Sequence, residues 1–363
     1  MTEAFRLVED APLDARNTFG IAARAPMLVE VADVVALPEL FGYAMLRDGP
    51  ILILGGGSNV LFAGDPSGAV LTLARQRIEM VEDGDVAIVR ADAGVQWHAL
   101  VLWTLGHGLA GLENLALIPG TVGAAPIQNI GAYGVEVGDC IHRVEAFERA
   151  TGKLQQLDRD ACAFAYRDSV FKREPDRYVV TAVEFILSRT PALKLDYSGL
   201  GEELAAMGVT APRPSHVAEA VCRIRRRKLP DPAVLGNAGS FFKNPITTTA
   251  QARALQAAHP SLPVFPLTPF PADAALHGVI GGDGLCKLSA AWLIDACGWK
   301  GHRDGDAGVA ESHALVLVNH GNATGMQLLD LARRIAGSVQ ERFGVMLEPE
   351  PRVIGATWRP EKE

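Results

Sequence analysis

The stretch Ile51-Leu52-Ile53-Leu54-Gly55-Gly56-Gly57-Ser58-Asn59-Val60 begins as a short apolar run and ends as a glycine-rich loop. The apolar run predicts a buried strand, and the three glycines predict that this strand ends in a sharp turn. A strand predicted over 27–31 and a helix predicted over 35–47 come before it, so we expect the chain to open with a β-α-β unit.

The loop itself can serve as an anion site, because its backbone N–H groups can form a nest for phosphate oxygens. Position 60 is valine, so the dinucleotide fingerprint G-x-G-x-x-G is incomplete, and no Walker A sequence follows. A Rossmann nucleotide site is therefore not predicted. On these residues alone, an anion site and a structural turn remain equally open.

A second glycine-rich segment is Ile118-Pro119-Gly120-Thr121-Val122-Gly123-Ala124-Ala125-Pro126, which runs on into Gln128-Asn129-Ile130-Gly131-Ala132-Tyr133-Gly134. Small residues alternate there with amides and hydroxyls, a composition that weakens the interior of strands and helices. It suits a chain that must lie against a flat ring system and a pyrophosphate. Two such segments indicate one large, dinucleotide-like ligand.

The rest of the chain mixes short strands with helices. Further strands are predicted over 69–73, 77–81, 86–91, 144–148, 153–157, 179–187 and 314–319. Helices are predicted over 96–105, from 215 to the stop at Pro230, over 287–297, and from the Thr324 cap with Gln327 in its capping box to Gly344. Prolines 260, 263, 266, 269 and 271 predict an extended loop. This mixture indicates an α+β fold.

Composition excludes several classes of protein. The 363 residues allow two or three domains, and 48% hydrophobic residues suffice for real cores. A net charge of -8, from 34 basic and 42 acidic residues, disfavours binding to nucleic acid or to an anionic membrane surface. No signal peptide or membrane-spanning segment is predicted, so we expect a cytoplasmic location. Five cysteines without a C-x-x-C pair predict reduced thiols, and the histidine spacing predicts no metal site.

The segment Gly239-Ser240-Phe241-Phe242-Lys243-Asn244-Pro245 places a hydroxyl among glycine, aromatic and amide groups. It contains no histidine base, so we expect Ser240 to donate a proton rather than to attack as a nucleophile. The two phenylalanines are expected to exclude water, while Lys243 and Asn244 offer donors to a polar substrate. The alternative is a tight turn that opens a hydrophobic strand.

Several segments together carry a family resemblance. They are Asn17-Thr18-Phe19, 54–60, 118–134, Tyr166-Arg167-Asp168-Ser169-Val170-Phe171, Lys228-Leu229-Pro230, 236–245, Trp292-Leu293-Ile294-Asp295 and Glu348-Pro349-Glu350. In this order they resemble the UDP-N-acetylenolpyruvoylglucosamine reductase family from about residue 17 to 355. Tyr197, in Leu195-Asp196-Tyr197-Ser198-Gly199-Leu200, matches the tyrosine loop of its type I branch.

The resemblance implies an α+β fold that contains an FAD-binding fold of the vanillyl-alcohol-oxidase (PCMH) type. The flavin would lie between two subdomains, residues 1–75 and 76–214, and a third, substrate-binding α+β domain would cover 215–344. The C-terminal segment 345–363 would return to the active site.

The resemblance also implies the reaction. NADPH would reduce non-covalently bound FAD, and the reduced flavin would pass hydride to the enolpyruvyl methylene carbon of UDP-N-acetylglucosamine enolpyruvate. The product would be UDP-N-acetylmuramate, a peptidoglycan precursor. Arg167 would stabilise the charge that develops on the substrate carboxylate, Ser240 would protonate the carbanion, and Glu350 would orient the enolate. The alternatives are an ion pair of Arg167 with Asp168, and Glu348 in place of Glu350.

The remaining site residues are also implied by family register. Cofactor contacts are expected from Gly55, Gly56, Gly57, Ser58, Asn59, Val60, Pro119, Gly120, Thr121, Gly123, Ala124, Gln128, Asn129, Gly131 and Ala132. Substrate contacts are expected from Tyr197, Lys228 and Asn244. The basic run 223–228 is interpreted as a solvated helix end from which Lys228 reaches the substrate diphosphate. Ala291 and Ala296 depart from the family pattern, and Ala296 puts one substrate contact in doubt.

Two other classes remain as alternatives. One is an FAD-linked oxidase of the same fold that acts on an alcohol or sugar, and the other is a non-catalytic flavin or sugar-nucleotide binding protein. Ser240 together with Glu350 argues against the oxidase, which needs a base and an oxygen path. No obligate protein partner is evident from the sequence.

Overall fold

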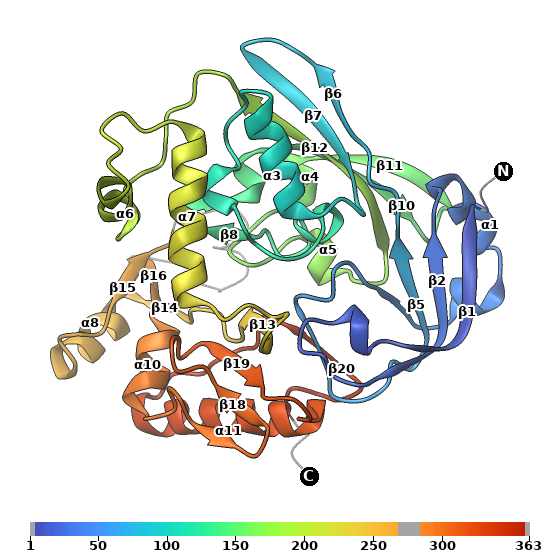
Figure 1. Ribbon diagram of the computed structural model, residues 1–363. Helices are drawn as coiled ribbons and strands as arrows, with labels where there is room; N and C mark the ends of the chain where they lie inside the picture. Colours follow the sequence, from blue (N-terminus) through green and yellow to red (C-terminus); the bar gives the residue numbers. More distant parts are fainter. Residues whose placement is uncertain (1–3, 268–283, 360–363) are drawn as a thin grey trace. The chain divides into compact units, whose positions relative to one another are not determined.

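The computed structural model describes residues 4–267 and 284–359 (Figure 1). The described chain divides into two compact units. Unit 1 comprises residues 4–11, 25–56 and 67–226, and unit 2 comprises 12–24, 57–66, 227–267 and 284–359. Each unit therefore combines segments that lie far apart in the sequence, and the glycine loop after β3 passes from unit 1 into unit 2 at residue 57.

The first sheet of unit 1 contains β1 (Phe5–Pro12), β2 (Arg24–Val31), β5 (Ala69–Leu73) and β3 (Ile51–Ile53), in that order. β2 and β3 both pair with β5 in parallel. The single helix expected over 35–47 is wrong, since the chain forms η2 (Val34–Ala36), α1 (Leu37–Leu40) and α2 (Ala44–Asp48). Phe41, in the break, stacks on Phe147 at 5.2 Å, and Tyr43 is extended, so packing overrides helix continuation.

The second sheet of unit 1 is antiparallel throughout and has the order β11-β10-β12-β7-β6. Its strands are β6 (Ile78–Glu82), β7 (Val86–Asp92), β10 (Ile141–Glu148), β11 (Lys153–Asp158) and β12 (Tyr178–Ser188). The sequence predicted each of them to within a few residues. The other elements of unit 1 are α3 (Trp97–Gly106), η3 (Glu113–Leu115), η4 (Val122–Ala124), β8 (Gly131–Ala132), β9 (Val135–Glu136), η5 (Val137–Asp139), α4 (Arg159–Cys162), α5 (Val170–Arg173), α6 (Leu200–Ala206) and most of α7 (Pro214–Lys228).

Unit 2 contains three small sheets. They are β13 (Gly236–Ser240), β19 (Val316–Asn319), β18 (Ala307–Val309) and β17 (Arg303–Asp304); β14 (Ile246–Thr248), β16 (Leu285–Leu288) and β15 (Val264–Pro266); and β4 (Val60–Phe62) with β20 (Arg352–Ile354). Its helices are η1 (Asp14–Arg16), α8 (Thr249–Ala258), α10 (Ala290–Ala296) and α11 (Gly325–Phe343).

Helix α11 packs along β18 and β19 (Figure 1). Thr324 and Gln327 form the predicted capping box, and Gly344, at a φ of 66°, ends the helix as expected. Gly325 is required at the first turn, because a Cβ there would overlap the carbonyl oxygen of Phe62 in β4. The helix is therefore fixed to the strand that follows the glycine loop.

Two expectations in unit 2 are wrong. The helix expected over 287–297 begins only at Ala290, because residues 285–288 pair with β14 and β15, and Ser289 then caps α10 by accepting from Trp292 N. The proline-rich loop contains strand β15; Pro269 and Pro271 lie outside the described residues.

Within the described residues, no helix combines the length and apolar character needed to cross a bilayer.

An ion cluster in the second sheet yields a stability prediction. Arg90 donates to Asp92 at 2.8 Å and to Glu145 at 3.1 Å, and the three side chains are 19%, 4% and 17% exposed. Arg90→Met leaves both carboxylates short of one cation, although Arg75 still contacts Asp92 at 3.1 Å. We expect urea unfolding to show a loss of about 2 kcal/mol, less than for a fully buried pair because the cluster is partly solvated.

The matched control is Arg6→Met. Arg6 is 70% exposed and lies 3.8 Å from Glu30, so the expected change is within about 0.5 kcal/mol. Equal losses for the two variants would contradict the assignment of the cluster as a stabilising element.

Candidate functional site

The structure brings the two glycine-rich segments together within unit 1. A Cβ on Gly55 would lie 2.6 Å from the Thr121 hydroxyl, and one on Gly56 would lie 3.0 Å from the Cα of Gly120. Trp97 N donates to Gly120 O at 3.0 Å, which fixes the second segment beside α3. A side chain at 56 would therefore force the two backbones apart, and one at 55 would displace the side chain of Thr121, so glycine suits this close approach.

Gly123 packs against the second sheet of unit 1. A Cβ on this residue would lie 2.5 Å from the Cβ of Ala93, and Gly123 N donates to Ala93 O at 3.0 Å. The residue is glycine because its backbone packs against the end of β7. A larger side chain at this position would disturb the sheet of unit 1 itself.

The second half of the first loop belongs to unit 2. Gly57 has a φ of 62°, and its carbonyl accepts from Thr18 N at 3.1 Å. Asn59 donates from Nδ2 to Glu350 O at 3.3 Å, and Asn59 O accepts from Arg352 N at 3.0 Å. Val60 begins β4, which pairs in parallel with β20. The loop is thereby joined to the segment that carries Glu350.

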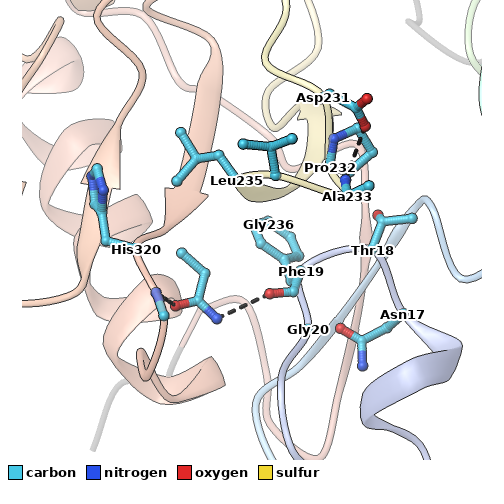
Figure 2. Close-up of a pocket in the computed structure, with 13 residues that line it drawn as sticks. Asn17, Thr18, Phe19, Gly20, Asp231, Pro232, Ala233, Leu235, Gly236 and His320 are labelled. Atoms are coloured by element: carbon cyan, nitrogen blue, oxygen red, sulfur yellow. Dashed lines mark hydrogen bonds between the residues drawn. The ribbon is translucent and has the colours of Figure 1, made fainter.

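The Asn17-Thr18-Phe19 motif is structural in unit 2. Asn17 bonds to the backbone of Leu13 and Ile21, and Phe19 O accepts from the side chain of Asn319 at 2.9 Å. These residues line a pocket of about 520 Å³ with the loop 231–236 (Figure 2). The two amide side chains are used in internal bonds, and no site residue expected from the sequence lines this pocket.

Asn129 belongs to unit 1 and is 0% exposed. Its Nδ2 donates to Glu136 at 2.7 Å and to Ala165 O at 3.1 Å, and its Oδ1 accepts from Gly138 N at 2.9 Å. The side chain joins the glycine-rich segment to the chain near Arg167. These hydrogen bonds use the side-chain amide of Asn129 inside unit 1.

Arg167 occupies a tight turn closed by reciprocal backbone hydrogen bonds between Ala165 and Asp168, and its φ is 55°. Its guanidinium donates to Gly131 O at 2.6 Å and to Asn129 O at 3.4 Å. Asp168, the alternative partner of Arg167, pairs with Arg173 at 2.5 Å. A non-glycine residue in the left-handed region is uncommon and clusters at functional sites.

Ser240 is the last residue of β13, opposite Val316 of β19. The pairing shifts register between Asn237 and Ser240, and Gly239 has a φ of 70°. Such bulges re-aim side chains. The turn alternative is wrong, because Ser240 ends a strand rather than opening one, and the two following phenylalanines are 0% and 1% exposed, as expected for a dry surrounding.

Glu350 and Ser240 are neighbours through the backbone of unit 2. Glu350 N donates at 2.7 Å to the carbonyl of Phe241, the residue after the serine. Glu348 is 64% exposed and pairs with Lys243 at 3.6 Å. The expectation that Glu348 and Glu350 share one face of a strand is wrong, because the chain forms only an isolated bridge there, at Pro349. The segment 348–350 therefore lies next to the residues that follow Ser240 in the chain.

The expected substrate residues lie in different surroundings. Tyr197 is 46% exposed in unit 1, and its ring meets Tyr133 edge-on at 4.9 Å. In unit 2, Lys228 is exposed. Burial of His313 lowers the pKa of that imidazole, and the positive charges of Lys228 and Lys300 lower it further. Asn244 Oδ1 accepts from Ala290 N at 3.0 Å and so supports the start of α10. Ala296 lies at the C-terminal end of that helix.

Sequence reasoning missed Arg225 by treating the basic run 223–228 as solvated. The Nε of Arg225 is buried and has no hydrogen-bond partner among the described residues. Burial lowers the pKa of the guanidinium, while Tyr133 and Cys222 act in the opposite direction and raise that pKa. The helical spacing was a signal, because Arg225 lies four positions after Val221 and eight after Val217, and both valines are buried. A buried donor next to the glycine-rich segment, and glycines that a Cβ would obstruct, fit an anionic dinucleotide.

In the described residues no group of acidic, histidine and cysteine side chains could hold a metal.

Comparisons with known proteins agree with a site for an anionic dinucleotide. Residues 25–158 match the family model described as FAD binding domain, and residues 231–354 match that of the UDP-N-acetylenolpyruvoylglucosamine reductase C-terminal domain. A UDP-N-acetylenolpyruvoylglucosamine reductase from Xanthomonas oryzae pv. oryzae (strain PXO99A) is 58% identical over 355 residues, 98% of each chain. One from Xylella fastidiosa (strain M12) is 55% identical over 350 residues, 96% of each chain.

Among solved structures, the UDP-N-acetylenolpyruvylglucosamine reductase (MurB) from Thermus caldophilus is similar with a TM-score of 0.65. It is 26% identical, and the match covers 96% of this chain and 98% of that one. These findings confirm the α+β fold with an FAD-binding domain of the vanillyl-alcohol-oxidase type. The chain belongs to the UDP-N-acetylenolpyruvoylglucosamine reductase family and is an FAD-dependent oxidoreductase of peptidoglycan precursor synthesis.

Proposed function

We propose that this chain uses NADPH to reduce the enolpyruvyl group of UDP-N-acetylglucosamine enolpyruvate, with Arg167, Ser240 and Glu350 as its catalytic residues. The observation that carries the proposal is the state of Arg167, whose guanidinium is held by backbone carbonyls while the adjacent carboxylate of Asp168 is committed to Arg173. These carbonyl bonds fix the direction of the guanidinium, and a guanidinium of fixed direction can bind a substrate carboxylate through two parallel N–H donors.

The cofactor residues that we propose are those expected in the two glycine-rich segments other than Gly123 and Asn129, and Arg225 is added to them. The close approach of 55–56 to 120–121 and the buried Arg225 Nε support this assignment. FAD supplies two-electron hydride chemistry when it is bound. The chain must bind and orient it and keep water away. Gly123 and Asn129 would shape this cradle from behind rather than contact the cofactor.

Arg167 would bind the substrate carboxylate and stabilise the negative charge that grows on it. A guanidinium presents a planar fork of donors that matches a carboxylate in two places. Its backbone carbonyl partners fix the fork before substrate arrives, and preorganised donors of this kind cost no reorganisation during the reaction.

Ser240 would give its hydroxyl proton to the carbon next to the carboxylate. A hydroxyl is a weak acid, but a carbanion is basic enough to take its proton in a dry site, and Phe241 and Phe242 are both buried beside it. Glu350, bonded through its N–H to Phe241 O, would orient the enolate by a hydrogen bond. Its neighbour Glu348 is held by Lys243.

Substrate binding is proposed for Lys228, Asn244 and Tyr197. The exposed Lys228 would bind the diphosphate, Asn244 has one amide end fixed by α10, and the half-exposed Tyr197 is placed on a loop suited to closing over the sugar nucleotide. We propose the three-part division 1–75, 76–214 and 215–344 as the functional one. The cytoplasmic location stays a prediction.

The alternative, an FAD-linked oxidase that acts on an alcohol or sugar, differs in the source of electrons. Its substrate would have to reduce the flavin, and it needs a base where this chain offers a hydroxyl. Ser240 beside Glu350 supports the reductase. Bleaching of the flavin by an alcohol, with no response to NADPH, would favour the oxidase.

The glycine cradle yields a prediction for Gly56→Ala. The added Cβ would meet the Gly120 backbone at 3.0 Å, so the two loops must separate. Overpacking of this kind costs about 1–3 kcal/mol, so we expect FAD to bind roughly ten- to hundredfold more weakly. Gly106→Ala, in open space at the end of α3, is the control and should bind FAD as the unaltered chain does. Equal FAD affinity in both variants would contradict the cradle.

Tyr197→Ala should raise the KM for the UDP-sugar while flavin reduction by NADPH stays unchanged, because the ring is exposed and supports a substrate loop rather than the cofactor. Tyr197→Phe keeps the ring that meets Tyr133 and serves as the control. Steady-state kinetics with varied sugar substrate measure the effect. An unchanged KM in the alanine variant would mean that the tyrosine only packs.

Ser240→Ala should leave FAD binding and its reduction by NADPH nearly intact but slow reoxidation by the enolpyruvyl substrate by roughly two to four decades, the usual contribution of a positioned general acid. Ser240→Cys should keep more activity, since a thiol can still donate a proton. Stopped-flow flavin absorbance separates the two half-reactions. Wild-type reoxidation in Ser240→Ala would require that the proton comes from water or Glu350.

A further inference from the structure

Four side-chain hydrogen bonds join the segment 127–131 to the segment 165–169 in unit 1. Arg167 donates to the carbonyls of residues 129 and 131, Asn129 Nδ2 donates to Ala165 O, and Ser169 Oγ donates to Ile127 O at 2.6 Å. The two segments are about 36 to 42 positions apart in the sequence. The turn that carries Arg167 and the second half of the glycine-rich segment therefore form one hydrogen-bonded body.

Asn129 and Ser169 contribute to this body from inside the protein. Both are 0% exposed, and the amide of Asn129 is bonded to Glu136, Ala165 and Gly138. Ser169 also caps α5 by accepting from Lys172 N at 3.4 Å. Side chains used in this way hold backbone in place and have no surface to offer to a ligand.

Arg167 needs such support, because its left-handed backbone is strained. A non-glycine residue at a φ of 55° costs on the order of 1 kcal/mol and persists only where the surroundings over-determine it. The bonds before and after the turn, at residues 165 and 169, supply that constraint, and Lys172 Nζ donates to the carbonyl of Arg167 itself at 3.0 Å.

We propose that Asn129 and Ser169 are positioning residues for the reaction: they hold the strained turn against the glycine-rich segment and so aim the Arg167 guanidinium. This inference rests on the proposed catalytic role of Arg167. It replaces the expected role of Asn129 as a cofactor ligand and gives Ser169 a role in the reaction.

Ser169→Ala carries the test, because it removes one hydroxyl and creates little space. The matched control is Asp158→Ala, which also removes the N-cap of a four-residue helix in unit 1, where Asp158 accepts from Ala161 N at 2.8 Å. Each loss of a cap should lower stability by about 1 kcal/mol. Within the described part of the chain, Asp158 makes no hydrogen bond to the segment 127–131, so a merely structural role predicts the same kinetics for both variants.

Two readouts are measured on the purified holoenzyme and one on the apoprotein. In the holoenzymes the dissociation constant for FAD is determined, and flavin reduced chemically under anaerobic conditions is mixed with the enolpyruvyl substrate. In the apoproteins, hydrogen exchange is followed over residues 127–139 and 163–171. We expect Ser169→Ala and Asn129→Ala to retain FAD affinity within about threefold, to exchange faster in both segments, and to reoxidise roughly ten- to hundredfold more slowly, since small misplacements have this effect.

A double-mutant cycle separates this inference from the proposed function. If Ser169 acts through Arg167, the double variant Arg167→Ala with Ser169→Ala reoxidises no more slowly than Arg167→Ala alone. Equal and multiplicative slowing by Ser169→Ala in both backgrounds would overturn the positioning role and leave the role of Arg167 intact. Wild-type reoxidation in Arg167→Ala would overturn both. A large loss of FAD affinity in Asn129→Ala would restore that residue as a cofactor ligand and overturn its assignment here.

Discussion

The close approach of two glycine-rich backbones in unit 1 is the constraint on which the site depends. A Cβ on Gly56 would lie only 3.0 Å from the Cα of Gly120, so a side chain at residue 56 would displace the other loop. The first loop is fixed by the strand before it, and the second by its bond to α3 and its packing on β7. Sheet geometry thereby determines the shape of the cofactor cradle, and the loops add the chemistry.

Hydrogen bonds connect this cradle to the proposed catalytic arginine. The segment that ends the cradle, 127–131, accepts and donates the bonds that hold the turn at Arg167. In unit 2, the same principle joins the other half of the first loop to Glu350, through Asn59 and the pairing of β4 with β20. In both units, residues that contact neither cofactor nor substrate would set the direction of those that do.

The sequence predicted much of this because many signals are local. The capping box of α11, the apolar residues of β7, β10 and β12 and the glycine loops are all signals carried by neighbouring residues. The edge strand β1 was not predicted, because most of its residues are exposed and its order comes from pairing. Arg225 was missed since its burial depends on residues distant in sequence, near Tyr133, and the strain at Arg167 depends on partners 36 positions away. Tertiary contacts decide these features.

The central claim is that electrons pass from NADPH through the flavin to the enolpyruvyl sugar. An anaerobic spectral titration of the purified holoenzyme tests it most directly. The account predicts that NADPH bleaches the flavin absorbance near its visible maximum, and that one equivalent of UDP-N-acetylglucosamine enolpyruvate restores it. Flavin that stays oxidised with NADPH, or that stays reduced after the sugar is added, would contradict the account.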